Sequence, residues 1–215
     1  IQKSLATTSP KLILTPALEN TFKQKLKSDK ATQLAYQLLL QRADALLDTK
    51  PLERKQIGKR LLSVSREAVR RLSTLSLAYR IAQREDYLKR IEQELLAVSE
   101  FKDWNPSHFL DVAEMSMAVA VALDWCGAWL SDEVKKKAKT ALIEKGLKQS
   151  IAAEPFNWWV DAYHNWNLVC HGGMSMAAIA VFEEEPEIAS LVLNRAVEKI
   201  PLGLTPYAPD GIYPE

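Results

Sequence analysis

Apolar side chains recur at intervals of three and four residues through most of the chain. The spacing is clear over 34–46 and again over 72–81. Such a repeat places apolar groups on one face of an α-helix, whereas a half-buried strand would alternate at every second residue. No Val-, Ile- or Thr-rich alternating segment bounded by hairpin turns competes with it. The pattern therefore predicts an all-α fold.

Proline residues divide the chain into periodic segments, because proline can open a helix but cannot continue one. Pro51, Pro106, Pro155, Pro186 and Pro201 all fall between such segments. We predict helices over 20–48, 52–82, 84–99, 106–130, 132–150, 166–183 and 187–200. Short connections between helices of this length indicate antiparallel helical hairpins. Bundle, solenoid and toroid arrangements all remain open, although no short repeat favours a regular solenoid.

Composition indicates one globular unit. Of 215 residues, 47% are hydrophobic and 26% charged, and the seven glycines form no linker-like stretch. We therefore predict a single domain over 1–215. The 28 Lys and Arg residues against 27 Asp and Glu residues give a net charge of +1, which offers no argument for nucleic acid or a membrane surface as partner. The basic run at 135–139 is interpreted as a solvated helix face.

Aromatic and imidazole side chains are concentrated in one part of the chain. All six tryptophans and all three histidines lie within 104–171. Trp125 and Trp129 are four positions apart in a very apolar segment, so we expect both in the core. Cys126 and Cys170 have no CxxC spacing, and we expect two buried thiols.

The segment that begins near residue 105 combines a helix start with unusual polar positions. Asn105 is the predicted N-cap and Pro106 the first helical residue. His108, Asp111 and Glu114 then recur every third position on a helix that is otherwise apolar on nearly every side. Such a helix is an inner one, so these polar groups either pair internally or line a cavity.

The densest cluster of chemistry lies within 157–173. Amides, imidazoles and indoles together are suited to hold a polar ligand and orient a ring. Asn165 or Asn167 could equally cap a helix. The pair Gly172 and Gly173 inside a helical pattern indicates close approach of another backbone or of a ligand. The sequence contains no recognisable metal-ligand set and no GxSxG, P-loop or GxGxxG motif, so no metal or cofactor is predicted.

Three ordered blocks resemble the helical domain of heparinase II/III-like polysaccharide lyases. They read DWNPSHFLDVAEM over 103–115, HNWNLVCHGGM over 164–174 and YAPDGIYPE over 207–215. The resemblance implies an incomplete (α/α) toroid, followed in longer members by antiparallel β-sheet domains that this sequence lacks. It also implies an anionic polysaccharide as substrate, and a periplasmic or secreted location.

The reaction implied is β-elimination at a uronic acid. The site neutralises the carboxylate beside the weakly acidic C5 proton, a base takes that proton, and an acid serves the leaving oxygen. The resemblance assigns the neutralising amide to Asn165 or Asn167, and makes His164 and His171 local acid or base candidates. The side chains expected to contact substrate are Trp158, Trp159, Trp166, His108, Glu114 and Tyr213. The catalytic tyrosine would follow Glu215, so we expect this chain to be the amino-terminal part of a longer lyase.

Two other functions remain open. A noncatalytic helical glycan-binding or interaction module could use the same tryptophans without chemistry. An (α/α)-barrel glycoside hydrolase would need two carboxylic acids flanking the scissile bond, for which Asp111, Glu114 and Asp161 are available.

Overall fold

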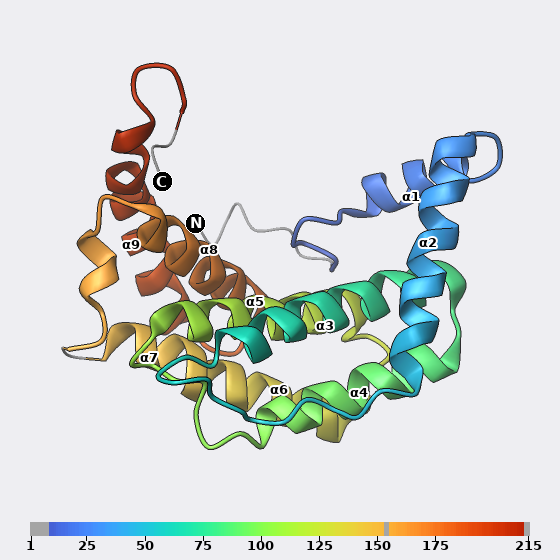
Figure 1. Cartoon of the computed structure of the whole chain (residues 1–215), viewed down its shortest axis with the longest axis horizontal. Helices are drawn as coiled ribbons and strands as arrows, with labels where there is room; N and C mark the ends of the chain where they lie inside the picture. The colour runs from blue at the N-terminus through green and yellow to red at the C-terminus, as the bar shows by residue number, and fades with distance from the viewer. Residues whose placement is uncertain (1–8, 153–154, 213–215) are drawn as a thin grey trace.

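The chain is helical throughout its described part. Figure 1 shows the computed structural model, in which residues 9–152 and 155–212 are described. Those residues contain helices and one isolated bridge between Ile57 and Arg60, but no strand. The α-helices are α1 (Pro16–Lys25), α2 (Lys30–Leu47), α3 (Leu62–Ala82), α4 (Glu85–Ser99), α5 (Phe109–Cys126), α6 (Asp132–Ala141), α7 (Lys148–Ile151), α8 (Asn165–Ala180) and α9 (Pro186–Leu204). A π-helix, η2 (Leu142–Leu147), joins α6 to α7, and the 3₁₀-helices η3 (Trp158–Asp161) and η4 (Thr205–Tyr207) precede α8 and follow α9. The all-α prediction is confirmed.

The predicted helix over 20–48 is wrong as a single element. The chain breaks between α1 and α2, where the Asp29 carboxylate accepts a hydrogen bond from the Thr32 N–H at 2.8 Å and caps α2. An aspartate at this position satisfies one of the unpaired N–H groups of the new helix. Asp29 therefore marks the start of a second helix, which the apolar periodicity alone did not indicate.

The predicted helix over 52–82 begins ten residues late, at Leu62. Residues 52–61 form an extended connection that includes Gly58, whose φ is +59°. That conformation favours glycine and interrupts a right-handed helix. The prediction over 132–150 likewise missed the π-helical turn η2, and Pro201 lies inside α9 instead of ending it.

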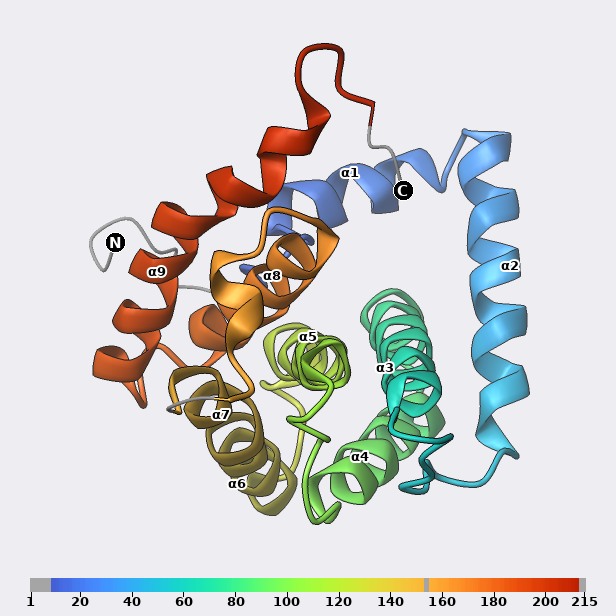
Figure 2. The same ribbon diagram turned by 60° about the vertical axis from the view of Figure 1, so that its left-hand side comes forward.

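The helices form two curved layers. Figure 2 shows α3, α5 and α8 side by side near the centre, with α4, α6, α7 and α9 outside them. Helix α5 packs between α3 and α8, and nearly all of its residues are buried. The interpretation of this apolar segment as an inner helix is confirmed. In the hairpins α3–α4 and α8–α9, consecutive helices pack against each other.

Hydrogen bonds at both ends show that α3 and α5 run in the same direction. At their N-terminal ends, the Leu61 N–H donates to the Asp111 carboxylate at 2.6 Å. At their C-terminal ends, the Arg80 guanidinium donates to the Trp125 carbonyl at 2.6 Å. Near the start of α8, Trp166 contacts His108 at the start of α5, so these two helices also begin at the same end.

A glycine sets the spacing between α5 and α8. A Cβ placed on Gly173 would lie 2.4 Å from the Ala113 carbonyl oxygen, whereas a Cβ on Gly172 would meet nothing within 4 Å. The close backbone approach that the Gly172–Gly173 pair predicted is confirmed at Gly173. This contact brings the second turn of α5 against the middle of α8.

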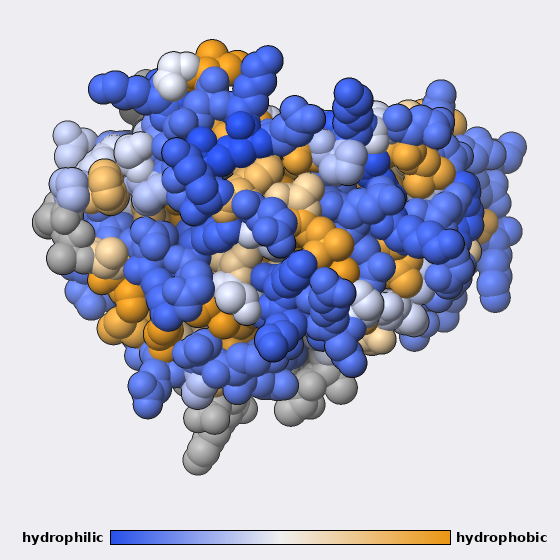
Figure 3. Space-filling model, turned by 90° about the horizontal axis from the view of Figure 1, so that it is seen from below, coloured by the Kyte–Doolittle hydropathy of each residue, from blue (hydrophilic) through white to orange (hydrophobic). Residues whose placement is uncertain are grey.

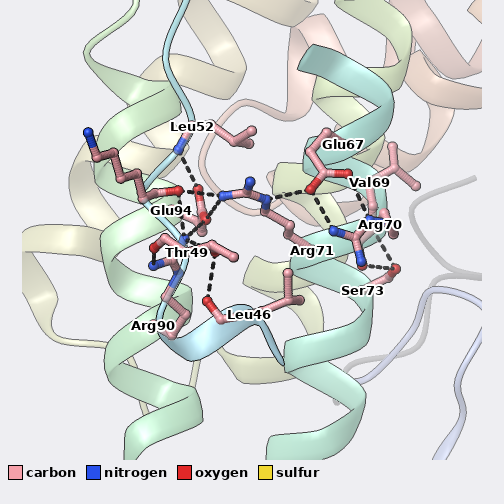
Figure 4. Close-up of polar contacts among 11 residues, drawn as sticks. Leu46, Thr49, Leu52, Glu67, Val69, Arg70, Arg71, Ser73, Arg90 and Glu94 are labelled. Atoms are coloured by element: carbon pink, nitrogen blue, oxygen red, sulfur yellow. Dashed lines mark hydrogen bonds and ion pairs between the residues drawn. The ribbon is translucent and has the colours of Figure 1, made fainter. Parts of the chain in front are cut away.

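A buried ion-pair network fixes the segment that follows α2 against α3 and α4 (Figure 4). The fully buried Glu94 carboxylate accepts from Arg71 at 2.7 Å, from Arg90, and from the Leu52 N–H at 2.9 Å. Arg90 also donates to the carbonyl of Thr49. Each buried charge therefore has a partner, which a buried ion requires if it is not to destabilise the fold.

The N-terminal segment covers the C-terminal end of α5. The N–H groups of Lys11 and Leu12 both donate to the Asp124 carboxylate at 2.8 Å, and the Trp125 indole N–H donates to the Leu12 carbonyl at 2.9 Å. Trp125 is buried as expected, but Trp129 is 41% exposed, so its placement in the core was wrong. It lies past the end of α5, with its ring beside Tyr79.

The surface over α4 and α6 is mostly hydrophilic, with smaller hydrophobic patches (Figure 3). Within the basic run, Lys135 pairs with Asp132 at 3.3 Å and Lys137 pairs with Glu133 at 3.2 Å. The interpretation of this run as a solvated face is confirmed. Across the described ranges, the structure contains no helix with the length and apolar character needed to cross a bilayer.

Candidate functional site

Four aromatic rings gather where the inner helices α5 and α8 begin. Trp158 and Trp166 lie with ring centroids 4.7 Å apart, and Trp158 lies 5.9 Å from His164. His108 meets Trp166 edge-on at 4.9 Å. We call Trp158, His164, Trp166 and His108 the aromatic surface. The structure thus brings together four of the predicted site residues, which are separated by up to 58 positions in sequence.

Local backbone geometry exposes Trp158 and makes His164 a helix cap. Trp158 opens η3 and is 48% exposed. His164 is the N-cap of α8, with extended backbone, and its Nδ1 accepts from the Trp166 N–H at 3.4 Å. Neither Asn165 nor Asn167 is the cap. Asn165 is instead the first residue of α8, beside the aromatic surface.

The start of α5 is organised by Asp111. This fully buried carboxylate accepts from the Leu61 N–H and from the Asn105 side-chain amide, each at 2.6 Å, and lies 2.8 Å from His108 Nδ1. Internal pairing, one of the two alternatives for the polar stripe, is therefore confirmed for Asp111.

Asn105 has a different role from the one predicted. Helix α5 begins at Phe109 with His108 as the N-cap residue, so the assignment of Asn105 as N-cap was wrong. Asn105 has a φ of +64°, a left-handed conformation that asparagine tolerates better than most residues. Its amide donates to the Lys59 carbonyl at 2.8 Å as well as to Asp111. Asn105 therefore locks the loop before α5 to the connection that precedes α3.

Glu114 lies one turn further along α5 and faces α3. Its carboxylate lies 3.3 Å from Arg66 Nε, and the side chain is 17% exposed. Burial raises the pKa of Glu114, and the Arg66 guanidinium opposes that shift. Arg66 was not identified from the sequence, because α3 has several arginines and only the packing of α3 on α5 selects this one.

Trp159 and His171 lie beneath the aromatic surface, in the core. Trp159 is fully buried, packing on Phe109 at 4.8 Å and edge-on to His171 at 4.8 Å. His171 is also fully buried, with Nε2 3.3 Å from the Val160 carbonyl oxygen. Burial lowers the pKa of His171, which favours the neutral imidazole.

Asn167 is likewise enclosed by protein. Its side chain is fully buried, and its amide donates to the carbonyls of Val160 at 3.0 Å and Lys199 at 3.2 Å. Glycine at position 203 makes room for it, because a Cβ there would lie 2.9 Å from Asn167 Oδ1. Asn167 therefore joins η3, α8 and α9. Neither Asn167 nor His171 reaches solvent in this conformation, and a catalytic role for either stays a prediction.

Two other residues considered for function lie apart from this cluster or outside the described part. Asp161 is largely exposed and pairs with Lys199 at 2.9 Å. Tyr213 lies outside the described residues.

Both cysteines are free and buried, as expected. Burial raises the pKa of the Cys126 thiol to about 12 and raises that of Cys170 well above its ordinary value. Such thiols are poor nucleophiles. Within 9–152 and 155–212, no three His, Cys, Asp or Glu side chains are grouped so as to hold a metal ion.

A pocket of about 330 Å³ lies at the opposite end of the inner helices from the aromatic surface. Its lining includes Lys11, Arg80, Asp124, Trp129 and Glu183. Arg80 pairs with Glu19, and Lys11 lies 3.5 Å from Glu183. The charged groups there largely satisfy one another, so this pocket has less to offer a ligand than the aromatic surface.

Comparison with known proteins does not assign the chain to a family: no protein-family model matches it, and no curated protein matches its sequence.

Proposed function

We propose that this chain provides part of the substrate-binding region of a polysaccharide lyase, which cleaves uronic-acid-containing glycans by β-elimination. The observation that carries the proposal is the aromatic surface. It joins residues from two of the three sequence blocks that resemble heparinase II/III-like lyases, at one end of the inner helices. The exposed indole of Trp158, tilted against the partly buried Trp166, suits the flat apolar side of a sugar ring.

The arrangement of the helices supports an incomplete (α/α) toroid as the architecture. An inner layer of α3, α5 and α8, whose members begin at the same end, is covered by outer helices that return in the opposite direction. The β-sheet domains implied by the resemblance would be a further part of the same polypeptide. A periplasmic or secreted location belongs to the same proposal.

Electrostatics at this end favour an anionic substrate. The N-terminus of an α-helix carries a partial positive charge and unpaired N–H groups. Helices α5 and α8 begin at the aromatic surface, but the buried Asp111 carboxylate already offsets the positive ends of α3 and α5, so the dipole available to a substrate anion is that of α8. A uronate carboxylate would be stabilised there although the net charge of the whole chain is only +1.

Among the predicted catalytic residues, we assign the direct roles to those nearest the surface. Asn165, at the first position of α8, would hold the uronate carboxylate, and His164 would exchange a proton with the substrate. Asn167 and His171 are fully buried beneath them and would position η3 and α8. Each of the four predicted catalytic residues then has a role, and none of these roles requires the core to open.

A noncatalytic glycan-binding module is the second candidate. The burial of Asn167 and His171 favours it, because two of the four predicted catalytic side chains are withdrawn from solvent. The hydrolase alternative has less support. Asp111 is buried and fully hydrogen-bonded, and Asp161 is paired with Lys199, so neither is arranged as an acid or a nucleophile.

The test is cleavage of a panel of uronate polysaccharides followed by ultraviolet absorbance, since β-elimination creates an unsaturated product. The 215-residue chain and the full-length gene product would be assayed in parallel. Release of unsaturated oligosaccharides supports a lyase. Saturated products would indicate a hydrolase, and binding without turnover by the full-length protein would indicate the module.

A matched pair of variants locates the binding surface. Trp158 and Trp129 are 48% and 41% exposed, at opposite ends of the inner helices. Trp158→Ala should weaken uronate oligosaccharide binding about 10-fold, since truncating an aromatic side chain that anchors a ligand typically costs more than about 1 kcal/mol. Trp129→Ala should leave binding unchanged. Equal effects of the two changes would contradict the placement.

A further inference from the structure

Arg66 differs from the other arginines of α3 in how loosely the protein holds it. Its Nε lies 3.3 Å from the Glu114 carboxylate, and its side chain is 64% exposed. The other three arginines of the helix each donate a hydrogen bond of 2.7 Å or less: Arg70 and Arg71 to Glu67, and Arg80 to the Trp125 carbonyl. Within the described ranges, neither Nη1 nor Nη2 of Arg66 has a hydrogen-bond partner. Both groups are therefore open to a ligand.

Glu114, the partner of Arg66, belongs to the one stripe of α5 that is partly exposed. Every residue of α5 except Leu110, Glu114 and Met117 is buried. These three positions are four and three residues apart, so they share one face of the helix. The Glu114 carboxylate therefore lies on the side of α5 that its neighbours leave uncovered, and Arg66 meets it there from α3.

This stripe begins at the aromatic surface. Burial raises the pKa of Glu114, and Arg66 and, more weakly, His108 oppose that shift. The influence of His108 places the Glu114 carboxylate close to the aromatic surface, where His108 meets the Trp166 ring at 4.9 Å. Glu114 also lies one helical turn beyond Asp111, whose carboxylate is 2.8 Å from His108 Nδ1. Arg66 is therefore at the same end of the inner helices as the aromatic surface, on the α3 side of α5.

The arrangement suits a ligand with more than one negative charge. A guanidinium is planar and always charged, and its paired N–H groups match the oxygens of a carboxylate or another oxyanion. Helices α8, α5 and α3 lie side by side in that order (Figure 2). A glycan that stacks on Trp158 beside α8 and continues across α5 would bring a second anionic group to Arg66.

We propose that Arg66 binds a second anionic group of the glycan, a carboxylate or a sulfate on a sugar beyond the one at the aromatic surface. The inference rests on the proposed lyase function and narrows the substrate to glycans that carry more than one anionic group. It also gives Glu114 a different role from the predicted substrate contact: Glu114 holds the Nε side of Arg66 and leaves Nη1 and Nη2 for the ligand.

Binding of charged oligosaccharides tests the proposal and identifies the anionic group. The probes are an alginate oligosaccharide, whose only anions are carboxylates, and a heparin oligosaccharide before and after desulfation. Arg66→Gln should weaken binding by about 3- to 10-fold, measured by isothermal titration calorimetry. A loss that disappears when heparin is desulfated identifies a sulfate. A loss that persists after desulfation, or that occurs with alginate, identifies a carboxylate.

Two controls separate this contact from other effects of the substitution. Lys136→Gln removes the same charge from an exposed position on the outer helix α6, and should leave binding within about twofold of wild type. An alginate oligosaccharide whose carboxylates have been reduced to alcohols should bind equally to wild type and to Arg66→Gln. Circular dichroism of each variant would show that its helix content is unchanged.

Turnover gives a further readout. Because Arg66 would bind the glycan equally before and during the reaction, Arg66→Gln should raise KM by a similar factor with little change in kcat. A large loss of kcat with unchanged KM would overturn the inference.

The inference and the proposed function fail in distinguishable ways. Unchanged binding of the charged oligosaccharides by Arg66→Gln, while Trp158→Ala weakens it, would overturn the inference and leave the proposed function standing. Equal weakening by Arg66→Gln and Lys136→Gln would do the same, because it would indicate a general effect of charge. Failure of the wild-type protein to bind any of the charged oligosaccharides would overturn both together.

Discussion

The contact between α5 and α8 can be tested with two neighbouring glycines on the same helix. Gly172→Ala and Gly173→Ala each add one methyl group within α8. A Cβ at 172 would meet no atom within 4 Å, whereas a Cβ at 173 would lie 2.4 Å from the Ala113 carbonyl oxygen and 2.8 Å from its carbon. The two variants therefore differ in packing but share almost the same change in helix propensity.

The expected magnitudes follow from these distances. Alanine is better than glycine in a helix interior by about 1 kcal/mol, so Gly172→Ala should raise the free energy of unfolding by that amount. At 173 the new methyl group meets backbone atoms, which cannot move away by changing rotamer. Relief requires α5 and α8 to separate by about 1 Å, and overpacking of this kind costs about 1–3 kcal/mol or more. We expect Gly173→Ala to lower the free energy of unfolding by about 2 kcal/mol.

Urea unfolding monitored by circular dichroism measures both changes, and an unchanged m-value would show that the unfolding reaction is the same. Separation of the helices should also move Trp166 relative to His108, so tryptophan fluorescence of the folded Gly173→Ala protein should differ from that of Gly172→Ala. Equal stability of the two variants would refute the close approach at Gly173.

Three further predictions concern buried charge, acid stability and thiols. Glu94→Gln should lower the free energy of unfolding by about 3–5 kcal/mol, because it leaves buried guanidinium groups without their carboxylate. As a control, Glu144→Gln at an exposed ion pair should lower it by only about 0–1 kcal/mol. Equal losses of stability in the two variants would contradict the role of the buried network. The hydrogen bond from Arg70 and the neighbouring Arg71 hold the pKa of Glu67 at about 2, below its usual 4.5, so its stabilising contribution is complete above pH 4.5 and is lost as pH falls towards 2. Acid titration of Glu67→Gln should therefore show a smaller loss of stability over that range than wild type. Cys126 and Cys170 should react with a thiol reagent only as fast as the protein unfolds, and rapid labelling of the native state would contradict their burial.

The fold class could be predicted from sequence because apolar spacing reports directly on helix formation. The apolar segment after residue 108 was correctly identified as an inner helix, since a helix without a polar face has to be enclosed by others. Helix boundaries were less predictable. Asp29 caps α2, and Gly58 interrupts the segment before α3. Both residues lie inside predicted helices, because the apolar spacing around them outweighed these local signals.

The candidate site was only partly predictable, because burial depends on tertiary packing. Trp158 and Trp159 are adjacent in sequence, but the 3₁₀ turn places one on the surface and the other in the core. Asn167 and His171 follow Asn165 on α8 by two and six positions, which turns them toward α9 and η3. No local signal distinguishes these outcomes.

The cluster around Asp111 was only partly predictable, for a different reason. It joins Asn105 and His108 to the backbone of Leu61, 50 positions away in sequence, and no spacing rule connects those elements. The polar stripe on α5 was the available signal. It indicated that an internal pairing was possible without showing which residues would complete it.

The most direct measurement is the appearance of unsaturated product when uronate polysaccharides are incubated with the protein, with the Trp158→Ala and Trp129→Ala variants alongside. The account predicts rising ultraviolet absorbance with at least one polymer, weaker binding in the first variant and unchanged binding in the second. Tight glycan binding with no product from any uronate polymer would contradict the lyase and leave the aromatic surface as a binding site.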